Sequence, residues 1–314
     1  MKVVLGSGTM GLSIAESFIM GGYETIVYDP FEKSLEKAKN KMPEDLKFLK
    51  SHDLFKESVD DLIKLVSFTS DLKEAVKEAD FILEAIPENL NLKLETFAEL
   101  EKFAPQDCFI GSNTSSLPFS KLIAGLSPKR QAKFLMCHWY NPGNIMPLVE
   151  LSAYGNMSDK DLNYIQNMFE KMGKVTILAK KEVPGMVANR IQQGIAREVF
   201  WLMANEVASP EDIDKALSFG PAFRYATSGQ LLIADMGGLD IWCTVGDNLL
   251  SVMDNSKEAN PLLRQKVKEG KLGIKSGEGF FKYPEEEKKK IQENYLDKLA
   301  KQLKISKTYL QDKE

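Results

Sequence analysis

A glycine-rich motif near the start of the chain constrains the fold more than any other feature. The segment Gly6-Ser7-Gly8-Thr9-Met10-Gly11 directly follows a short apolar run, Val3-Val4-Leu5, and opens a stretch whose apolar residues have helical spacing. Glycines at these three positions allow a tight turn, a close approach of the backbone to a pyrophosphate, and close packing of the helix on the sheet. The motif in this setting predicts a dinucleotide-binding βαβ unit.

An acidic residue after the next predicted strand indicates which dinucleotide binds. Asp29 follows the β-branched run Thr25–Tyr28. A carboxylate there can accept hydrogen bonds from the adenosine ribose hydroxyls and would repel a 2′-phosphate, which favours NAD over NADP. A glycine-rich turn without a ligand and an FAD-binding loop are the alternatives. The residues expected at the cofactor from this part of the chain are Gly6, Gly8, Thr9, Met10, Gly11 and Asp29.

The alternation of strand and helix patterns continues well beyond this motif. Further apolar runs of strand length occur at 65–68, 81–86, 108–111, 133–137, 148–151 and 175–178. After residue 185 such runs stop, and helical windows follow at 186–207, 211–217, 229–235 and 238–254. The pattern predicts an α/β fold in which a doubly wound, mostly parallel Rossmann-type sheet over residues 1–183 is followed by a smaller all-α domain over residues 184–314.

Two segments allow predictions about individual helices. Residues 31–66 have helical spacing but contain Pro43, so we expect the helix to break there. Residues 285–314 are rich in charge, and Ile291, Tyr295, Leu299 and Leu303 recur on one helical face, which predicts an amphipathic surface helix.

Charge and composition exclude several classes of function. The chain has 314 residues and a formal net charge of -4, so it has no broad basic field for nucleic acid or an anionic membrane. Its apolar runs are shorter than the roughly 20 residues of a membrane span, and the start of the chain is interpreted as a strand rather than a signal peptide. We expect a cytoplasmic protein without a metal site whose three widely spaced cysteines are buried free thiols.

Motifs spread over residues 1–283 resemble the 3-hydroxyacyl-CoA dehydrogenase family. The matching segments are the glycine motif, Glu88-Asn89-Leu90 with Lys93, Ser112–Leu117, His138–Pro142, Pro147–Glu150, Val183–Arg190 and Leu272–Tyr283. The resemblance implies a Rossmann domain, a helical dimerisation domain and an active site in the cleft between them. It also implies NAD-dependent oxidation of a short-chain L-3-hydroxyacyl-CoA to the 3-ketoacyl-CoA, as in fatty acid metabolism.

A histidine and a glutamate suit the chemistry of such an oxidation. Removing the proton from a hydroxyl requires a base, and the pKa of a free imidazole, about 6.5, lies near the working pH. His52 lies in a charged helical segment and is interpreted as a surface residue, whereas His138 ends an apolar strand. Glu150 lies in the next strand, so the two side chains can meet if the strands are neighbours, and a carboxylate on one ring nitrogen sets the tautomer. The family uses such a His–Glu pair.

The resemblance assigns further site residues. Ser115 matches a serine that hydrogen-bonds the substrate oxygen, and Asn189 matches an asparagine that orients the substrate or the histidine. Simple structural roles, a turn for Ser115 and helix packing for Asn189, remain alternatives. The positions expected near the nicotinamide or its ribose are Glu88, Lys93, Asn141 and Lys275. Lys93 could instead be a solvated helix charge.

Other features depart from the acyl-CoA pattern. His138 precedes Trp139 and Tyr140 instead of two phenylalanines, and the chain continues beyond Tyr283 to residue 314. Residues 208–226 resemble the branch that acts on free hydroxy acids, such as gulonate and carnitine dehydrogenases.

Arg224, within that segment, could bind a free substrate carboxylate through two parallel hydrogen bonds, unless it pairs with an acid of the protein. Lysines could instead contact CoA phosphates or form a solvated face; they are Lys33, Lys37, Lys39, Lys41 and Lys47.

Three hypotheses follow for the function. The first is a 3-hydroxyacyl-CoA dehydrogenase, the second a dehydrogenase of a free 3-hydroxy acid, and the third a non-catalytic NAD-binding protein. The partners expected are a small-molecule substrate and a second copy of the chain. Phe200, Trp201 and Met203 are candidates for the dimer surface.

Overall fold

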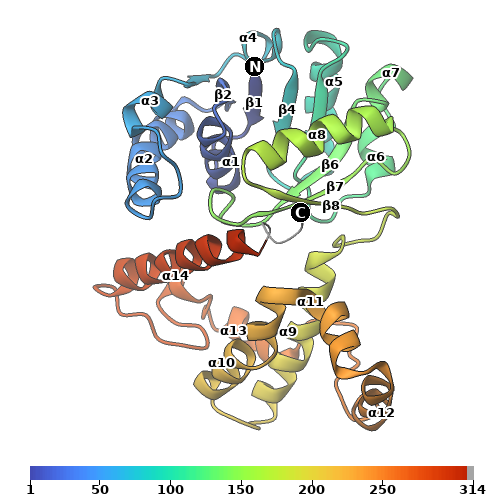
Figure 1. The fold of residues 1–314 in the computed structure, drawn as a ribbon. Coiled ribbons are helices and arrows are strands. Elements are labelled where there is room, and N and C mark those ends of the chain that lie inside the picture. Colours follow the sequence, from blue (N-terminus) through green and yellow to red (C-terminus); the bar gives the residue numbers. More distant parts are fainter. Residues whose placement is uncertain (310–314) are drawn as a thin grey trace. The chain divides into compact units, whose positions relative to one another are not determined.

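The computed structural model describes residues 1–309 and divides the chain into two compact units. The first unit is Met1–Val187 and the second begins at Ala188, so the division falls a few residues after the boundary predicted at residue 183. Figure 1 shows the sheet of the first unit and the helices of the second.

The first unit is built on an eight-stranded sheet with the order β3-β2-β1-β4-β5-β6-β7-β8. Neighbouring strands are parallel except β6 and β7, which are antiparallel. The strands are β1 Lys2–Leu5, β2 Thr25–Tyr28, β3 Val66–Thr69, β4 Phe81–Glu84, β5 Phe109–Ser112, β6 Phe134–Trp139, β7 Leu148–Ser152 and β8 Val175–Leu178. Because the strand order reverses direction at β1, the carboxyl ends of β1 and β4 border the crevice in which such sheets bind ligands. The predicted doubly wound sheet is confirmed.

Helices cover both faces of this sheet. They are α1 Thr9–Met20, α2 Glu32–Ser51, α3 Val59–Ile63, α4 Leu72–Val76, α5 Leu90–Phe103, α6 Phe119–Ile123, α7 Pro128–Gln131 and α8 Asp159–Lys171. On one face, Phe18 of α1 contacts the rings of Trp139 and Phe169. On the other, Phe134 of β6 contacts Phe97 of α5 and Phe119 of α6. Because side chains alternate along a strand, β6 contributes to both layers of the core.

The second unit is helical, as predicted. It contains α9 Ala188–Ala204, α10 Pro210–Phe219, α11 Pro221–Gly237, α12 Leu239–Leu249, α13 Pro261–Lys268, the short 3-10 helix η1 Ile274–Ser276, and α14 Lys288–Thr308. The predicted C-terminal helix is present over Lys288–Thr308, and residues 310–314 lie outside the described residues. None of the helices in the described part of the chain is long and apolar enough to cross a membrane.

Two local expectations are wrong. Helix α2 runs through Pro43 without breaking, because a buried stripe continues on both sides of it; the stripe consists of Leu35, Ala38, Met42, Leu46 and Leu49. Packing of that face outweighs the single hydrogen bond that a proline removes. Cys108 and Cys137 are buried as expected, but Cys243 is exposed, because it lies on α12, none of whose side chains is buried.

Candidate active site

The glycine motif forms the turn between β1 and α1. Gly6 has a φ of +99°, and a Cβ there would lie 2.8 Å from the carbonyl oxygen of Ala85. A Cβ on Gly11 would lie 1.9 Å from the carbonyl oxygen of Gly6. Both glycines are therefore required by the protein itself, one by the conformation of the turn and the other by the close packing of α1 on that turn.

Gly8 differs from these two glycines. A Cβ there would meet nothing within 4 Å, and its φ is −69°, which any residue adopts. Gly8 is also the N-cap of α1, and no side chain caps that helix end. An open glycine at an uncapped helix N-terminus leaves backbone N–H groups and space for an anion, so these residues fit the pyrophosphate of a dinucleotide.

Asp29 lies directly after β2 and holds the glycine motif. Its Oδ2 accepts hydrogen bonds from the backbone N–H of Ser7 at 2.9 Å and from the Ser7 hydroxyl at 2.8 Å, while Oδ1 accepts one from the N–H of Phe31. A carboxylate has about four lone-pair positions, so Asp29 retains capacity for a ribose hydroxyl. Its predicted role, binding of the adenosine ribose, stays a prediction.

The pairing of β6 with β7 brings His138 and Glu150 together. The two residues are opposite each other in the antiparallel register, so their side chains project from the same face. His138 Nδ1 lies 2.9 Å from Glu150 Oε2, and Glu150 Oε1 accepts a hydrogen bond from the N–H of Val187. Glu150 is fully buried and His138 is nearly so.

The other ring nitrogen of His138 faces Ser115. The distance from Nε2 to the Ser115 hydroxyl oxygen is 3.1 Å. If the carboxylate of Glu150 accepts the proton on Nδ1, Nε2 carries the lone pair and the Ser115 hydroxyl donates to it. The three side chains therefore form a hydrogen-bonded series whose basic nitrogen lies next to a hydroxyl.

Glu88 organises the loop that carries Ser115. Its Oε1 accepts hydrogen bonds from the Thr114 hydroxyl, from the N–H groups of Ser115 and Ser116, and from the Ser116 hydroxyl, at 2.6 to 3.1 Å. The hydrogen bonds from Thr114 and Ser116 lower the pKa of Glu88 in spite of its partial burial. Glu88, predicted only as a neighbour of the nicotinamide, thus holds the Ser115 loop in its conformation.

Lys93 is buried, which contradicts the alternative of a solvated helix charge. Its Nζ lies 2.5 Å from Glu84 Oε1 and 3.4 Å from Glu88 Oε2. Glu84 is also fully buried, and its other oxygen accepts a hydrogen bond from the Ser112 hydroxyl. Burial raises the pKa of Glu84, while Lys93 and Ser112 act against that rise.

Sequence reasoning missed Glu84. The signal was present, because a charged residue inside the buried apolar run 81–86 requires a partner.

The remaining predicted residues lie elsewhere. Asn141 follows β6 and is joined to Pro142 by a cis peptide bond. Asn189 is in the first turn of α9, Lys275 is in η1, and Arg224 is exposed on α11. These last three belong to the second unit. Among residues 1–309, no group of three or more His, Cys, Asp or Glu side chains is arranged to hold a metal ion.

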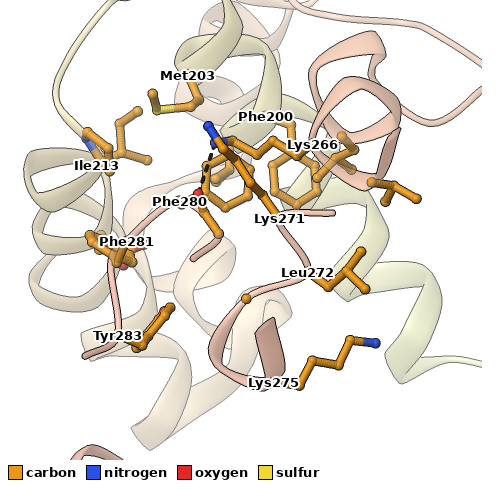
Figure 2. Close-up of a pocket in the computed structure, with 17 residues that line it drawn as sticks. Phe200, Met203, Ile213, Lys266, Lys271, Leu272, Lys275, Phe280, Phe281 and Tyr283 are labelled. Carbon is orange, nitrogen blue, oxygen red and sulfur yellow. Dashed lines mark hydrogen bonds between the residues drawn. The ribbon is translucent and has the colours of Figure 1, made fainter. Parts of the chain in front are cut away.

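The second unit contains a pocket of about 500 Å³, lined by α9, α10, α13 and the segment around η1. Phe200 stacks on Phe280 with ring centroids 5.7 Å apart (Figure 2). Lys266 lies over the ring of Phe280 and donates a hydrogen bond to the carbonyl oxygen of Gly279. Phe200 and Met203, two candidates for a dimer surface, line this pocket instead of lying fully exposed. Lys275 also lines it.

Comparison with known proteins agrees with this geometry. The family model for the 3-hydroxyacyl-CoA dehydrogenase NAD binding domain matches residues 2–183, and the model for the C-terminal domain of that family matches residues 185–283. The mitochondrial hydroxyacyl-coenzyme A dehydrogenase of Sus scrofa is 32% identical over 289 residues, which cover 89% of this chain and 90% of that protein.

A second kind of relative matches a longer part of the chain. The 5-formyl-3-hydroxy-2-methylpyridine 4-carboxylate 5-dehydrogenase of Mesorhizobium japonicum is 32% identical over 298 residues, 95% of each chain. A crystal structure of a protein of this activity, described as an NAD⁺-dependent dismutase, superimposes with a TM-score of 0.89 over 97% of each chain at 30% identity. The (S)-3-hydroxybutyryl-CoA dehydrogenase from Ralstonia eutropha gives 0.72 over 90% of this chain and 99% of its own, at 28% identity.

Proposed function

Because the chain belongs to the 3-hydroxyacyl-CoA dehydrogenase family, an NAD-dependent family of oxidoreductases, we propose that it oxidises a substrate hydroxyl to a carbonyl with His138 as the general base. One observation carries the proposal. Ser115, His138 and Glu150 are joined by hydrogen bonds of 3.1 and 2.9 Å at the carboxyl edge of the sheet that bears the glycine motif.

Each of these side chains has a distinct task. His138 Nε2 takes the proton from the substrate hydroxyl, and Glu150 stabilises the resulting imidazolium through Nδ1–H. When the substrate is bound, the Ser115 hydroxyl turns from His138 Nε2 to the substrate oxygen and donates a hydrogen bond to it, where negative charge develops as the proton leaves. In the site formed by the glycine motif and Asp29, a bound NAD would supply the acceptor for the hydride of the carbon that carries the hydroxyl. Asn189 and the predicted nicotinamide neighbours keep the roles implied by the resemblance, as part of the proposal.

A substitution of each histidine tests the role of the base. We expect His138→Ala to lower kcat by about 10²- to 10⁴-fold, the usual contribution of a general base, while the affinity for NADH stays within about twofold. His52→Ala, the matched control directly after the end of α2, should retain wild-type turnover. Steady-state rates and NADH fluorescence titrations measure both quantities. An active His138→Ala variant would contradict the proposal, and a wild-type protein that binds NADH but turns over no hydroxy substrate would favour a non-catalytic role.

For the substrate we propose a small hydroxy compound with a free carboxylate rather than a CoA thioester. Arg224 is exposed, and within the described residues its guanidinium forms no ion pair with a protein acid, which was the alternative to carboxylate binding. The similarity to a pyridine carboxylate dehydrogenase extends over 95% of each chain and supports the same class. The CoA thioester remains the second candidate, favoured by relatives that cover 89% to 90% of this chain.

A substrate panel separates the two classes. 3-Hydroxybutyryl-CoA is compared with free 3-hydroxy acids and with hydroxymethyl- and formylpyridine carboxylates. If Arg224 binds a carboxylate, Arg224→Ala raises KM for the free acids by about 10- to 100-fold, as expected for a charge-assisted hydrogen bond, and leaves the thioester unaffected. Arg264→Ala, another exposed arginine, is the control. A preference for the thioester that Arg224→Ala does not change would overturn the free-acid assignment.

The second unit supports a further part of the proposal, a homodimer. Large apolar side chains of α11 and α12 are exposed in the isolated chain; they include Phe223, Leu231, Met236, Leu239 and Ile241. Monomeric proteins rarely expose so many neighbouring apolar groups. A second copy of the chain would cover them.

The free thiols fit a reducing cytoplasm.

A further inference from the structure

A buried polar network joins helix α1 to the loop between β6 and β7. This loop, residues 140–147, connects the strand of His138 to the strand of Glu150 and contains Asn141. Helix α1 begins at the glycine motif. The network therefore links the cofactor-binding turn to the segment that sets the pairing of the base with its carboxylate.

Two serines of α1 hold the loop at Gly143. The N–H of Gly143 donates to the Ser13 hydroxyl at 3.2 Å, and the Ser17 hydroxyl donates to the carbonyl oxygen of Gly143 at 3.1 Å. A Cβ on Gly143 would lie 2.9 Å from the Ser13 hydroxyl oxygen and 3.3 Å from a side-chain carbon of Ile14. The loop backbone thus lies directly on the helix, at a distance that only glycine allows.

Two buried ionisable residues complete the network. Asn144 donates from Nδ2 to Glu16 Oε2 at 2.6 Å. Lys174 donates from Nζ to the carbonyl oxygens of Gly143 at 2.6 Å and Met146 at 3.1 Å, and lies 5.0 Å from the ring centre of Trp139. Glu16 is fully buried and Lys174 is 7% exposed.

Burial of the Glu16 carboxyl group costs free energy. An isolated buried carboxylate is strongly disfavoured, so such a group holds its proton. Burial, and next the carboxylate of Asp45, raise the pKa of Glu16 well above its usual value, whereas Asn144 and Lys41 act in the opposite direction. Within residues 1–309, Glu16 Oε1 and Asn144 Oδ1 have no hydrogen-bond partner. Apolar side chains of the same shape would avoid this cost, so packing alone gives no reason for the two polar groups.

We propose that Glu16 is a positioning residue: through Asn144, and together with Ser13, Ser17 and Lys174, it fixes the 140–147 loop on α1 and thereby the place of the His138–Glu150 pair relative to the bound dinucleotide. The role in turnover rests on the proposed function. The attachment of the loop to α1 does not, since it concerns only contacts within the first unit.

Substitutions at Glu16 test the role in turnover. Glu16→Gln keeps the size and the carbonyl acceptor for Asn144, so it should retain kcat within about threefold, whereas Glu16→Leu should lose kcat by about 10- to 100-fold, the effect of a small misplacement of reacting groups. The affinity for NADH should change by less than about threefold in both. Thr25→Val is the control, because it removes the hydrogen bond of another buried residue of this unit, from the Thr25 hydroxyl to the Tyr23 carbonyl. It should lower Tm without lowering kcat.

A second variant removes the same contact from the loop side. Asn144→Ala should reproduce the loss of kcat. The double variant Glu16→Leu/Asn144→Ala should have a kcat no lower than that of the less active single variant, because both substitutions remove the same interaction. If Glu16→Leu fails to fold, Asn144→Ala alone carries the test. Additive losses, or equal losses in Glu16→Gln and Glu16→Leu, would overturn the proposal.

Amide hydrogen exchange provides a readout that needs no substrate. Exchange of the amides of residues 143–146 should accelerate by about tenfold or more in Asn144→Ala, with β1 and α5 unchanged, since local contacts control local opening. Unchanged exchange in this loop would refute the attachment of the loop to α1. If the wild-type protein turns over none of the substrates tested, the proposed function fails, while this measurement still decides whether the network holds the loop.

Discussion

At the scale of single residues, Glu150 uses both carboxylate oxygens inside the protein. One faces His138 Nδ1 and the other accepts the N–H of Val187, and no part of the residue is exposed. An ionised Glu150 can only accept hydrogen bonds, so a neutral imidazole beside it presents its N–H on Nδ1 and its lone pair on Nε2. The tautomer of the proposed base is thus decided by one neighbour.

Replacing this carboxylate by an amide therefore has a specific consequence. Glu150→Gln can present an NH₂ group to Nδ1, which would place the ring proton on Nε2 and remove the base. We expect kcat to fall by about 10³-fold or more, as in other sites where the wrong tautomer is imposed, with little change in Tm. Rates and thermal unfolding measure the two effects. A variant that kept more than a tenth of kcat would show that Glu150 does not set the tautomer.

The raised pKa of Glu16 predicts that the stability of the protein depends on pH. Its pKa is raised in the folded protein, so the folded state holds the proton where the unfolded chain has already lost it. Its contribution to stability is then complete below the unfolded pKa, near the usual value of 4.5, and decreases as the pH rises toward the folded pKa. Urea unfolding from about pH 5 to about pH 8 should show Glu16→Gln gaining stability relative to the wild type. A constant difference across this range would contradict a raised pKa.

At the scale of elements, the turn between β1 and α1 contains glycines that are required for two different reasons. Gly6 and Gly11 satisfy the protein's own geometry, since a Cβ at either position would meet backbone atoms at 2.8 and 1.9 Å. Gly8 has open space around it and an ordinary φ. Only a ligand that approaches the backbone gives a reason for glycine at this position.

Alanine at two of these positions should separate stability from binding. Gly8→Ala should leave Tm nearly unchanged and weaken NADH binding by at least about tenfold, because the methyl group occupies the space of the pyrophosphate. Gly11→Ala should lower the free energy of unfolding by about 1–3 kcal/mol through overpacking. Calorimetry and NADH titration of both variants provide the comparison. Tight NADH binding by Gly8→Ala would place the pyrophosphate elsewhere.

At the scale of the whole molecule, the two units differ in how they bury apolar groups. The sheet unit encloses its core between two layers of helices, whereas α11 and α12 leave large apolar side chains exposed, among them Leu231 at 85% and Met236 at 83%. The burial of such groups is the main favourable term in association. The second unit is therefore where we expect a second copy of the chain to bind.

Charge on this surface should prevent the association. Leu231→Lys together with Met236→Lys should convert the dimer to a monomer in sedimentation velocity, because buried unpaired charges oppose association by several kcal/mol. Lys301→Ala, a change on the exposed face of α14, is the control. A wild-type protein that sediments as a monomer at micromolar concentration would contradict the dimer.

Much of the fold follows from local patterns in the chain. The glycine motif, the strand-length apolar runs and the change to helical spacing after residue 185 predict the doubly wound sheet and the helical second part, because backbone geometry ties each pattern to one element type. The same patterns place His138 and Glu150 on successive strands. Whether those strands pair, and in which register, is a tertiary question, and the antiparallel pairing of β6 and β7 answers it.

The sequence by itself thus determined most of the element types and the cofactor-binding turn, and it was enough to propose His138 as the base. The tertiary structure alone decided the contacts between buried polar groups that are distant in the chain: Lys93 with Glu84, Glu88 with the Ser115 loop, and Glu16 with Asn144. The tertiary structure also decided that α2 continues through Pro43, because packing of its apolar face outweighed the tendency of proline to break a helix. The physical reason is common to all of them, because a buried polar group requires a partner, and only the folded chain specifies which one lies within reach.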